Sequence, residues 1–414
     1  MTDNWGRGRA EPVAVGPPRR RMTRADRMRE ARGHRKRRMG RGFVLAMLIV
    51  VVIGAVFLGS KLWHTMSGGG TDFSGDGVND VVIQIHDGDS TTAIGKSLQE
   101  RNVVATVAAF VGAAEGNAAI SSIQPGFYKV RTEIPASNAV ARLADPQNRV
   151  GKLVIPEGRQ LDDIQDVKTN AVTDGILSLI SQATCVNLDG DRHCVSVDDL
   201  KKSAGSAAPS SLSVPDWAMN AVAALGNDHR RLEGLIAPGT WNIDPSAPPQ
   251  GILATLIGAS ATQYAQGGLL DTAKAMNMSP YQILTVGSLV QRESKPDDFA
   301  KVARVIYNRL AENRTLEFDS TVNYPLDRIE VATTDADRGQ HTLWNTYVRP
   351  GLPATPICSP GQPALAAAEQ PAPGDWLYFV TIDLQGTTLF TRDYDQHLAN
   401  IELAKHNGVL DSAR

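Results

Sequence analysis

The chain has 414 residues and a formal net charge of −2, a length that predicts two or three folded units. The charge is unevenly distributed: residues 1–41 hold 14 Arg and Lys against 4 acidic residues, whereas residues 65–414 hold 27 basic and 40 acidic residues. The acidic body disfavours nucleic acid as its partner. The basic tail still allows nucleic acid or an anionic membrane.

The segment that follows the tail favours the membrane. Residues 43–63 read FVLAMLIVVVIGAVFLGSKLW and carry no charge before Lys61. This run is long enough to span a bilayer, while a cleaved signal peptide would have a shorter apolar core and a small-residue cleavage site. We therefore expect a transmembrane helix at 43–63 and a disordered, cytoplasmic basic tail at 1–42. The remaining chain is then extracytoplasmic, on a single-pass protein of the plasma membrane.

A flexible linker at 64–79, rich in Gly, precedes the first folded region. In residues 80–150 we expect a strand at 81–85, two helices, a turn and strand at 125–130, and a further short helix. This order resembles small modules of the LysM type, which bind cell-wall glycans. A structural module that positions the next domain is the alternative. Residues 152–164 weakly repeat the strand, Gly turn and helix.

The next region is predicted to be mostly helical over residues 165–228, with a further helix over 253–276. Cys185 and Cys194 are close in sequence, and an extracytoplasmic location permits a disulfide between them. Two free thiols are the alternative, and the cysteines with His193 match no standard zinc site. Cys358 is expected to be buried. We expect no metal and no cofactor.

The most informative stretch begins at Ser279. Ser279 can cap a helix, Pro280 suits the first helical position, and Gln282 completes a capping-box pattern. The helix that follows is apolar on nearly every face and should be buried. It stops before Pro296. Glu293 is thus predicted to lie in the last turn of a buried helix.

This placement has consequences for the chemistry of Glu293. The partial negative charge of a helix C-terminus and an apolar environment both raise the pKa of a carboxyl group. A raised pKa suits a general acid at neutral pH. Arg292 and Lys295 act in the opposite direction. The alternative is an exposed helix-end Glu that pairs with Lys295.

The C-terminal third contains several further predicted elements. An apolar stripe predicts a helix from 299 to 310, and residues 344–361, with four prolines, predict a rigid loop that lines a cleft. Three more elements are expected: a polar turn at 319–324, a strand pair at 376–381 and 387–391, and a final helix at 394–406.

Five motifs in this order and at close spacing resemble the MltG (YceG-like) family of endolytic murein transglycosylases. They are LTVGSLVQRES, VARVIYNRL, LEFDSTVNY, WNTYVRPGLPATPICSPG and LYFV. The resemblance covers residues 80 to 410 and implies an α+β fold: a membrane anchor, a LysM-like α/β module at 80–150 and a YceG-like catalytic domain at 151–414. It also implies cleavage of the β-1,4 bond between N-acetylmuramic acid and N-acetylglucosamine in nascent glycan strands. The products end in 1,6-anhydro-N-acetylmuramic acid, and the implied partners are wall synthases and division or elongation proteins.

The resemblance also assigns residues. Glu293 matches the catalytic Glu, although Gly287 stands where Ala is usual and Gln291 where a second Glu is common. Seven further positions match motif residues and are predicted to bind substrate: Glu233, Asn308, Asp319, Ser320, Thr321, Tyr347 and Thr355.

Three of these assignments carry alternatives, and a fourth departs from the family motif. Asn308 could hold substrate, orient Glu293 or simply lie on the helix surface, and Tyr347 could stack on a sugar or simply pack. Ser320 replaces the Pro of a D-P-T motif. Glu233 could instead be structural and bond backbone amides between lobes. Two other functions stay open: a muramidase that uses Glu293 with Asp319 or Glu233, and a non-catalytic, membrane-anchored wall or division scaffold.

Overall fold

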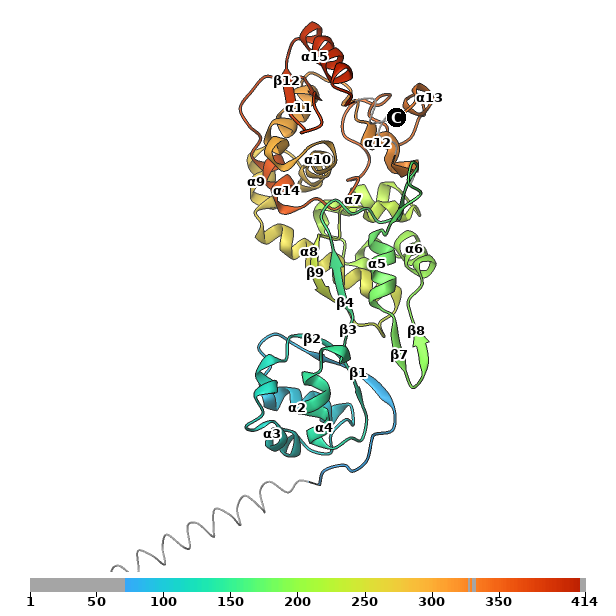
Figure 1. The fold of residues 1–414 in the computed structure, drawn as a ribbon, viewed down its shortest axis with the longest axis vertical. Coiled ribbons are helices and arrows are strands. Elements are labelled where there is room, and N and C mark those ends of the chain that lie inside the picture. The colour runs from blue at the N-terminus through green and yellow to red at the C-terminus, as the bar shows by residue number, and fades with distance from the viewer. Residues whose placement is uncertain (1–70, 327, 330–332, 410–414) are drawn as a thin grey trace, which may run out of the picture. The chain divides into compact units, whose positions relative to one another are not determined.

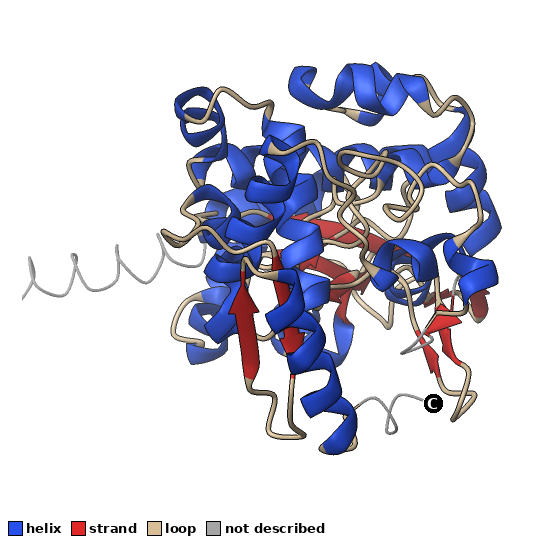
Figure 2. Cartoon of the chain, turned by 90° about the horizontal axis from the view of Figure 1, so that it is seen from above, coloured by secondary structure: helices blue, strands red, loops and turns tan. Residues whose placement is uncertain are grey.

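The computed structural model describes residues 71–326, 328–329 and 333–409, which belong to a unit that spans Gly70–Arg414 (Figure 1). The predicted tail, the helix at 43–63 and most of the linker lie outside the described residues. Within the described ranges, no helix is long and apolar enough to cross a bilayer. The fold is mixed α+β: helices predominate, and the strands, red in Figure 2, form small sheets of two or three strands.

Residues 80–150, here called the N-terminal module, have a hydrophobic core of their own. The elements are β1 (Asp80–Ile85), α2 (Thr91–Glu100), α3 (Val107–Ala114), β2 (Gly126–Arg131), α4 (Ala136–Ala144) and β3 (Arg149–Val150). β2 lies between β1 and β3 and pairs antiparallel with both. Ser90 and Thr106 cap α2 and α3 by accepting hydrogen bonds from backbone amides. The expected order of strand, two helices and strand is therefore present.

A second, larger core begins at Leu153. Its first part contains β4 (Lys152–Ile155), β5 (Ile164–Asp166), β6 (Val172–Thr173), α5 (Ile176–Ala183), β7 (Val186–Leu188), β8 (Asp191–His193), α6 (Val197–Ser206), α7 (Asp216–Ala224) and β9 (Gly239–Asn242). β4 pairs with β9, β5 pairs with β6, and β7 pairs with β8, all antiparallel. β10 (Arg328–Ile329) adds a parallel strand to β5. Short 3-10 helices lie at Ala118–Ser122, Pro146–Asn148, Pro209–Leu212, His229–Leu232, Pro296–Asp298 and Tyr324–Leu326.

Two predictions for this part are wrong. The helix expected within residues 152–164 is a turn followed by strand β5, because the side chains of Asp162 and Asp163 bond elsewhere: Asp162 to His229 and Asp163 to the amide of Gly175. These bonds reach residues 12 and 67 positions away and hold the segment in a non-helical conformation. The mostly helical interpretation of 165–228 also missed two hairpins, β5–β6 and β7–β8.

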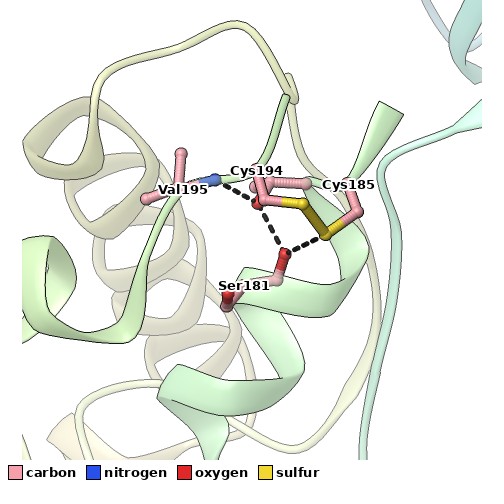
Figure 3. The surroundings of a disulfide bond; sticks show 5 residues. Ser181, Cys185, Cys194 and Val195 are labelled. Carbon is pink, nitrogen blue, oxygen red and sulfur yellow. Dashed lines mark hydrogen bonds between the residues drawn. A yellow bond between two sulfur atoms is a disulfide. The ribbon is translucent and has the colours of Figure 1, made fainter. Parts of the chain in front are cut away.

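Cys185 and Cys194 form a disulfide at the open end of the β7–β8 hairpin (Figure 3). The Cys185 Sγ also lies 3.4 Å from the carbonyl oxygen of Ser181, and the Val195 amide donates to Thr184 Oγ1 at 3.0 Å. The link fastens the hairpin to the end of α5. Cys358 is free and buried, as predicted.

The helix expected over 253–276 is two helices, α8 (Pro249–Gln266) and α9 (Leu269–Ala275). Gly268, with φ of +96°, separates them, a backbone conformation that favours glycine. Next comes α10 (Pro280–Glu293), and the predicted capping box is confirmed: Ser279 accepts from the Gln282 amide, and Gln282 accepts from the Ser279 amide. Nine residues of α10 are buried, namely Tyr281 and the eight consecutive residues 283 to 290, whereas Gln282 between them is exposed.

Helix α10 is the centre of the larger core (Figure 1). It packs against α7, α9, α11 (Phe299–Ala311) and α14 (Gln362–Glu369). The loop at 344–361, which has no helix or regular strand, bonds to it: Ser288 Oγ accepts from the amide of Ile357 at 3.0 Å, and Cys358 Sγ lies 3.4 Å from the Ser288 carbonyl oxygen. These hydrogen bonds to α10 support the prediction that the 344–361 loop is rigid.

The remaining elements are α12 (Asp319–Asn323), α13 (Asp335–Arg338), β11 (Tyr378–Thr381), β12 (Thr388–Thr391) and α15 (Tyr394–His406). The strand pair and the last helix confirm the predictions. The polar turn expected at 319–324 is wrong, because this segment is the short helix α12. Its Thr321 side chain bonds the carbonyl of Phe318 and the hydroxyl of Thr346, which anchors the helix to the 344–361 loop.

Candidate active site

A cleft of about 290 Å³ opens at the C-terminal end of α10. Its walls come from α10, α11, α12, residues 316–318, the 344–361 loop, β11 and α15. Three of the lining residues carry carboxylates: Glu293, Glu317 and Asp319. The Glu317 carboxylate forms an ion pair with Arg309 at 2.9 Å. Tyr347, which was predicted at this cleft from its loop, also lines it.

Glu293 is the last residue of α10 and is half-buried. Burial raises the pKa of its carboxyl group to about 7, opposed by a hydrogen bond from Ser320 and reinforced by the charge of Asp319. This is the direction that placement at the end of a buried helix predicts. Lys295 does not pair with Glu293; its ammonium donates to the carbonyl of Gln385 at 2.8 Å. A carboxyl group with this pKa can donate a proton near neutral pH.

Ser320 contacts Glu293 directly. The Ser320 hydroxyl donates a hydrogen bond to Glu293 Oε1. Helix α12 places this side chain, because Ser320 lies in its first turn. Ser320, for which substrate binding stays a prediction, thus orients the carboxyl group of Glu293 through Oε1.

Asp319 is held by a polar network of neighbouring side chains. Its carboxylate accepts hydrogen bonds from Thr333 Oγ1 at 2.6 Å, Tyr347 OH at 2.8 Å and Arg338 Nη2 at 3.1 Å. The Arg338 guanidinium also lies over the Tyr347 ring, 5.1 Å from its centroid. The network fixes Asp319 and Tyr347 in place, and it commits the Tyr347 hydroxyl to Asp319.

Three other predicted substrate residues lie outside the cleft lining. Asn308 donates to the carbonyls of Trp376 at 2.9 Å and Gly374 at 3.3 Å. Thr321 and Thr355 are fully buried, and Thr355 Oγ1 accepts from the Trp344 indole at 2.7 Å. Their side chains form hydrogen bonds within the walls of the site, and substrate binding by these three residues stays a prediction.

Glu233 is also buried, with 1% of its surface exposed. Its Oε2 accepts from the Leu161 amide at 3.0 Å and from Tyr324 OH at 2.8 Å. Burial raises the pKa of Glu233 to about 8. It is absent from the cleft lining, so it is not a second carboxylate of this cleft. The alternative assignment, a structural Glu that bonds a backbone amide, fits these contacts.

Comparisons with known proteins agree with this architecture. Residues 83–403 match the YceG-like family. The chain belongs to the YceG-like family. A Bacillus subtilis (strain 168) protein named endolytic murein transglycosylase is 26% identical over 325 residues, which cover 78% of this chain and 84% of that protein. A Streptococcus pneumoniae protein of the same name is 23% identical, and the match covers 58% of its length.

The crystal structure of a YceG-like protein from Listeria monocytogenes has the same fold, with a TM-score of 0.50 and 23% identity. The match covers 77% of this chain and 98% of that one. Among the residues described, no group of three or more His, Cys, Asp or Glu side chains is placed to hold a metal ion.

Sequence reasoning missed four residues of this YceG-like site. Arg309, Tyr378 and His397 line the cleft, and Arg338 holds Asp319. Arg309 lies in the recognised VARVIYNRL motif and could have been found there; its Nε donates to the Leu377 carbonyl at 2.7 Å. Tyr378 lies in the recognised LYFV motif and could also have been found there. His397 and Arg338 carry no local signal, because only the tertiary fold brings them to the site.

Proposed function

We propose that this protein is an endolytic peptidoglycan lytic transglycosylase. It cleaves the β-1,4 bond between N-acetylmuramic acid and N-acetylglucosamine inside nascent glycan strands and so terminates their polymerisation. The observation that carries the proposal is the half-buried carboxyl group of Glu293, which lies in the cleft and whose pKa is raised to about 7. The relatives named endolytic murein transglycosylase support the same reaction.

The reaction needs one group that acts first as an acid and then as a base. The protonated Glu293 donates to the glycosidic oxygen as the bond to C1 of the muramic acid breaks. The C6 hydroxyl oxygen of the same sugar then bonds to C1, and its proton passes to Glu293. The enzyme returns to its starting state, no water is consumed, and the new end is a 1,6-anhydro sugar.

A muramidase is the second candidate, because Asp319 lines the same cleft as Glu293. Hydrolysis would require a second carboxylate to activate water or to attack the sugar. The Asp319 carboxylate already accepts hydrogen bonds from Thr333, Arg338 and Tyr347. These bonds favour a fixed electrostatic role for Asp319 over a nucleophilic one.

The proposal extends to location. The uncharged apolar run at 43–63, with the Arg-rich tail before it, supports a single-pass anchor in the plasma membrane with the catalytic domain outside. The strand–helix–helix–strand order of the N-terminal module supports a LysM-like unit that binds glycan or positions the catalytic domain. Wall synthases and division or elongation proteins are the proposed protein partners, because they produce the strand to be cut.

The test is mass spectrometry of the fragments that the full-length chain releases from uncrosslinked glycan strands, with Glu293→Gln in parallel. Anhydro-muramic ends that disappear in the variant would support the transglycosylase. Reducing ends would support the muramidase. Absence of cleavage, under conditions where a known lytic enzyme is active, would contradict both and favour a scaffold.

A further inference from the structure

Three aromatic side chains meet at the α15 end of the cleft. The rings of Tyr378, on β11, and His397, on α15, are stacked with centroids 4.9 Å apart. Tyr394, in the first turn of α15, packs against Tyr378 in a tilted arrangement at 5.4 Å. The N-cap Asp393, which accepts from the Gln396 amide at 2.7 Å, fixes the start of the helix. We call Tyr378, Tyr394 and His397 the aromatic cluster.

The aromatic cluster continues the active-site cleft onto the surface. Tyr378 and His397 belong to the cleft that contains Glu293. Tyr394 is 56% exposed, although it rests on Tyr378. Arg309 and Arg314 hold Tyr378 from another side: the Arg309 guanidinium lies 5.0 Å from its ring centroid, and Arg314 donates to its hydroxyl at 2.9 Å. Tyr394 is therefore an exposed ring on a rigid support at the end of the cleft.

The chemistry of this surface suits a neutral ring with polar edges. Aromatic side chains offer an apolar face and tolerate polar groups around it. Burial lowers the pKa of His397, which favours the uncharged imidazole. Its Nδ1 is buried and has no hydrogen-bond partner among the described residues. The exposed Tyr394 face can pack against the C–H face of a pyranose ring.

The length of the substrate also indicates that the glycan strand extends beyond the cleft. An enzyme that cuts inside a glycan strand must hold sugars on both sides of the broken bond. A cleft of about 290 Å³ holds only the rings nearest to Glu293, so the strand must continue over the adjoining surface. The aromatic cluster is continuous with one end of the cleft.

We propose that the aromatic cluster is an additional glycan-binding subsite, in which an N-acetylhexosamine ring of the strand stacks on Tyr394 away from the bond that is cut. This inference rests on the proposed function. The subsite increases the affinity for long strands and takes no part in the bond-breaking step. Tyr394 is thus a substrate-binding residue, and its removal affects binding of strands that are long enough to reach it.

The test compares Tyr394→Ala with Tyr394→Phe, which keeps the ring, in the full-length chain. Leu403→Ala is the matched control, because Leu403 is 40% exposed on the same helix. Leu403 lies nine residues after Tyr394, which places it on about the opposite face of the helix. Each change is also made in the Glu293→Gln background, where binding of long strands and of the shortest fragment the wild type cleaves is measured by calorimetry.

Tyr394→Ala should weaken binding of long strands about tenfold and raise KM by a similar factor, with kcat unchanged. Tyr394→Ala should bind the shortest fragment with the same affinity as the parent chain does. Tyr394→Phe and Leu403→Ala should behave like the parent chain. Equal affinity of Tyr394→Ala and parent for long strands would overturn the subsite and leave the proposed function intact. Equal loss for long and short substrates would also overturn it, since it would indicate a general structural effect.

Failure of the proposed function would look different. The wild type would then release no anhydro-muramic ends, whatever the state of Tyr394. If it also bound no glycan strand, the subsite would be overturned with it. A strand that binds without being cut, and binds more weakly to Tyr394→Ala, would support the subsite alone.

Discussion

Removal of the Ser320 hydroxyl should move the pH profile of the reaction in a defined direction. The hydroxyl donates to Glu293 Oε1 and lowers the pKa of that carboxyl group, against the larger effect of burial, which sets it at about 7. The first step requires protonated Glu293, so kcat/KM falls as pH rises through this pKa. Ser320→Ala takes away a bond that favours the ionised form. The alkaline limb of the profile should therefore move to higher pH.

The size of the shift follows from the strength of the bond. A hydrogen bond of this kind contributes about 1 kcal/mol net, and one pKa unit corresponds to about 1.4 kcal/mol. The limb should move up by roughly 0.7 pH units. The rate at the optimum should also fall, because the carboxyl group is less well oriented without the bond.

The assay is kcat/KM for release of anhydro-muramic fragments across the pH range, with Asp319→Asn as the partner variant. Asp319 raises the pKa of Glu293 through its charge, so Asp319→Asn should move the same limb to lower pH. Opposite shifts are difficult to obtain from general damage to the site. An unchanged limb in Ser320→Ala, or shifts of both variants in one direction, would refute the assignment of the limb to Glu293.

Three further predictions concern stability. Burial raises the pKa of Glu233 from its ordinary 4.5 to about 8, so its contribution to the unfolding free energy is fully present below pH 4.5 and is lost as pH rises towards 8. Glu233→Gln should flatten this decline of the unfolding free energy with pH, measured in denaturant titrations, and should leave kcat unchanged. A large loss of kcat would instead show that Glu233 takes part in the reaction. Gly287→Ala should raise the unfolding free energy by about 0.5–1 kcal/mol, because the new Cβ would meet Leu365 atoms at an ordinary 3.4 Å; destabilisation would show that α10 and α14 cannot accept it. Reduction of the Cys185–Cys194 disulfide, which closes a separation of 9 residues, should lower the unfolding free energy by about 2–3 kcal/mol in the same titrations. An unchanged unfolding free energy would mean that this disulfide does not stabilise the fold by constraining the unfolded chain.

Local signals were sufficient to predict the centre of the fold. The capping pattern of Ser279 and Gln282, the continuous apolar run and Pro296 define both ends of α10, and with them the position of Glu293. The final helix and the β11–β12 pair follow from periodicity in the same way. The residues that specify each of these elements lie within the element or directly next to its ends.

The failures have a common physical cause, which is bonding between distant segments. Asp162 and Asp163 use their carboxylates on His229 and Gly175, so the chain at 159–164 does not form a helix. Thr355 carries a plausible substrate-binding motif, yet its hydroxyl is consumed by Trp344 in the core. His397 reaches the cleft only because α15 packs on β11, which no local pattern in the sequence indicates.

The central claim is that Glu293 alone breaks the glycosidic bond without water. The most direct measurement is the mass of the released ends when the full-length chain digests glycan strands in heavy-oxygen water. We expect anhydro-muramic ends with no heavy oxygen at the new terminus, and no such ends from Glu293→Gln. Reducing ends that carry heavy oxygen would contradict it, because water would then have attacked the sugar and a second catalytic group would be required.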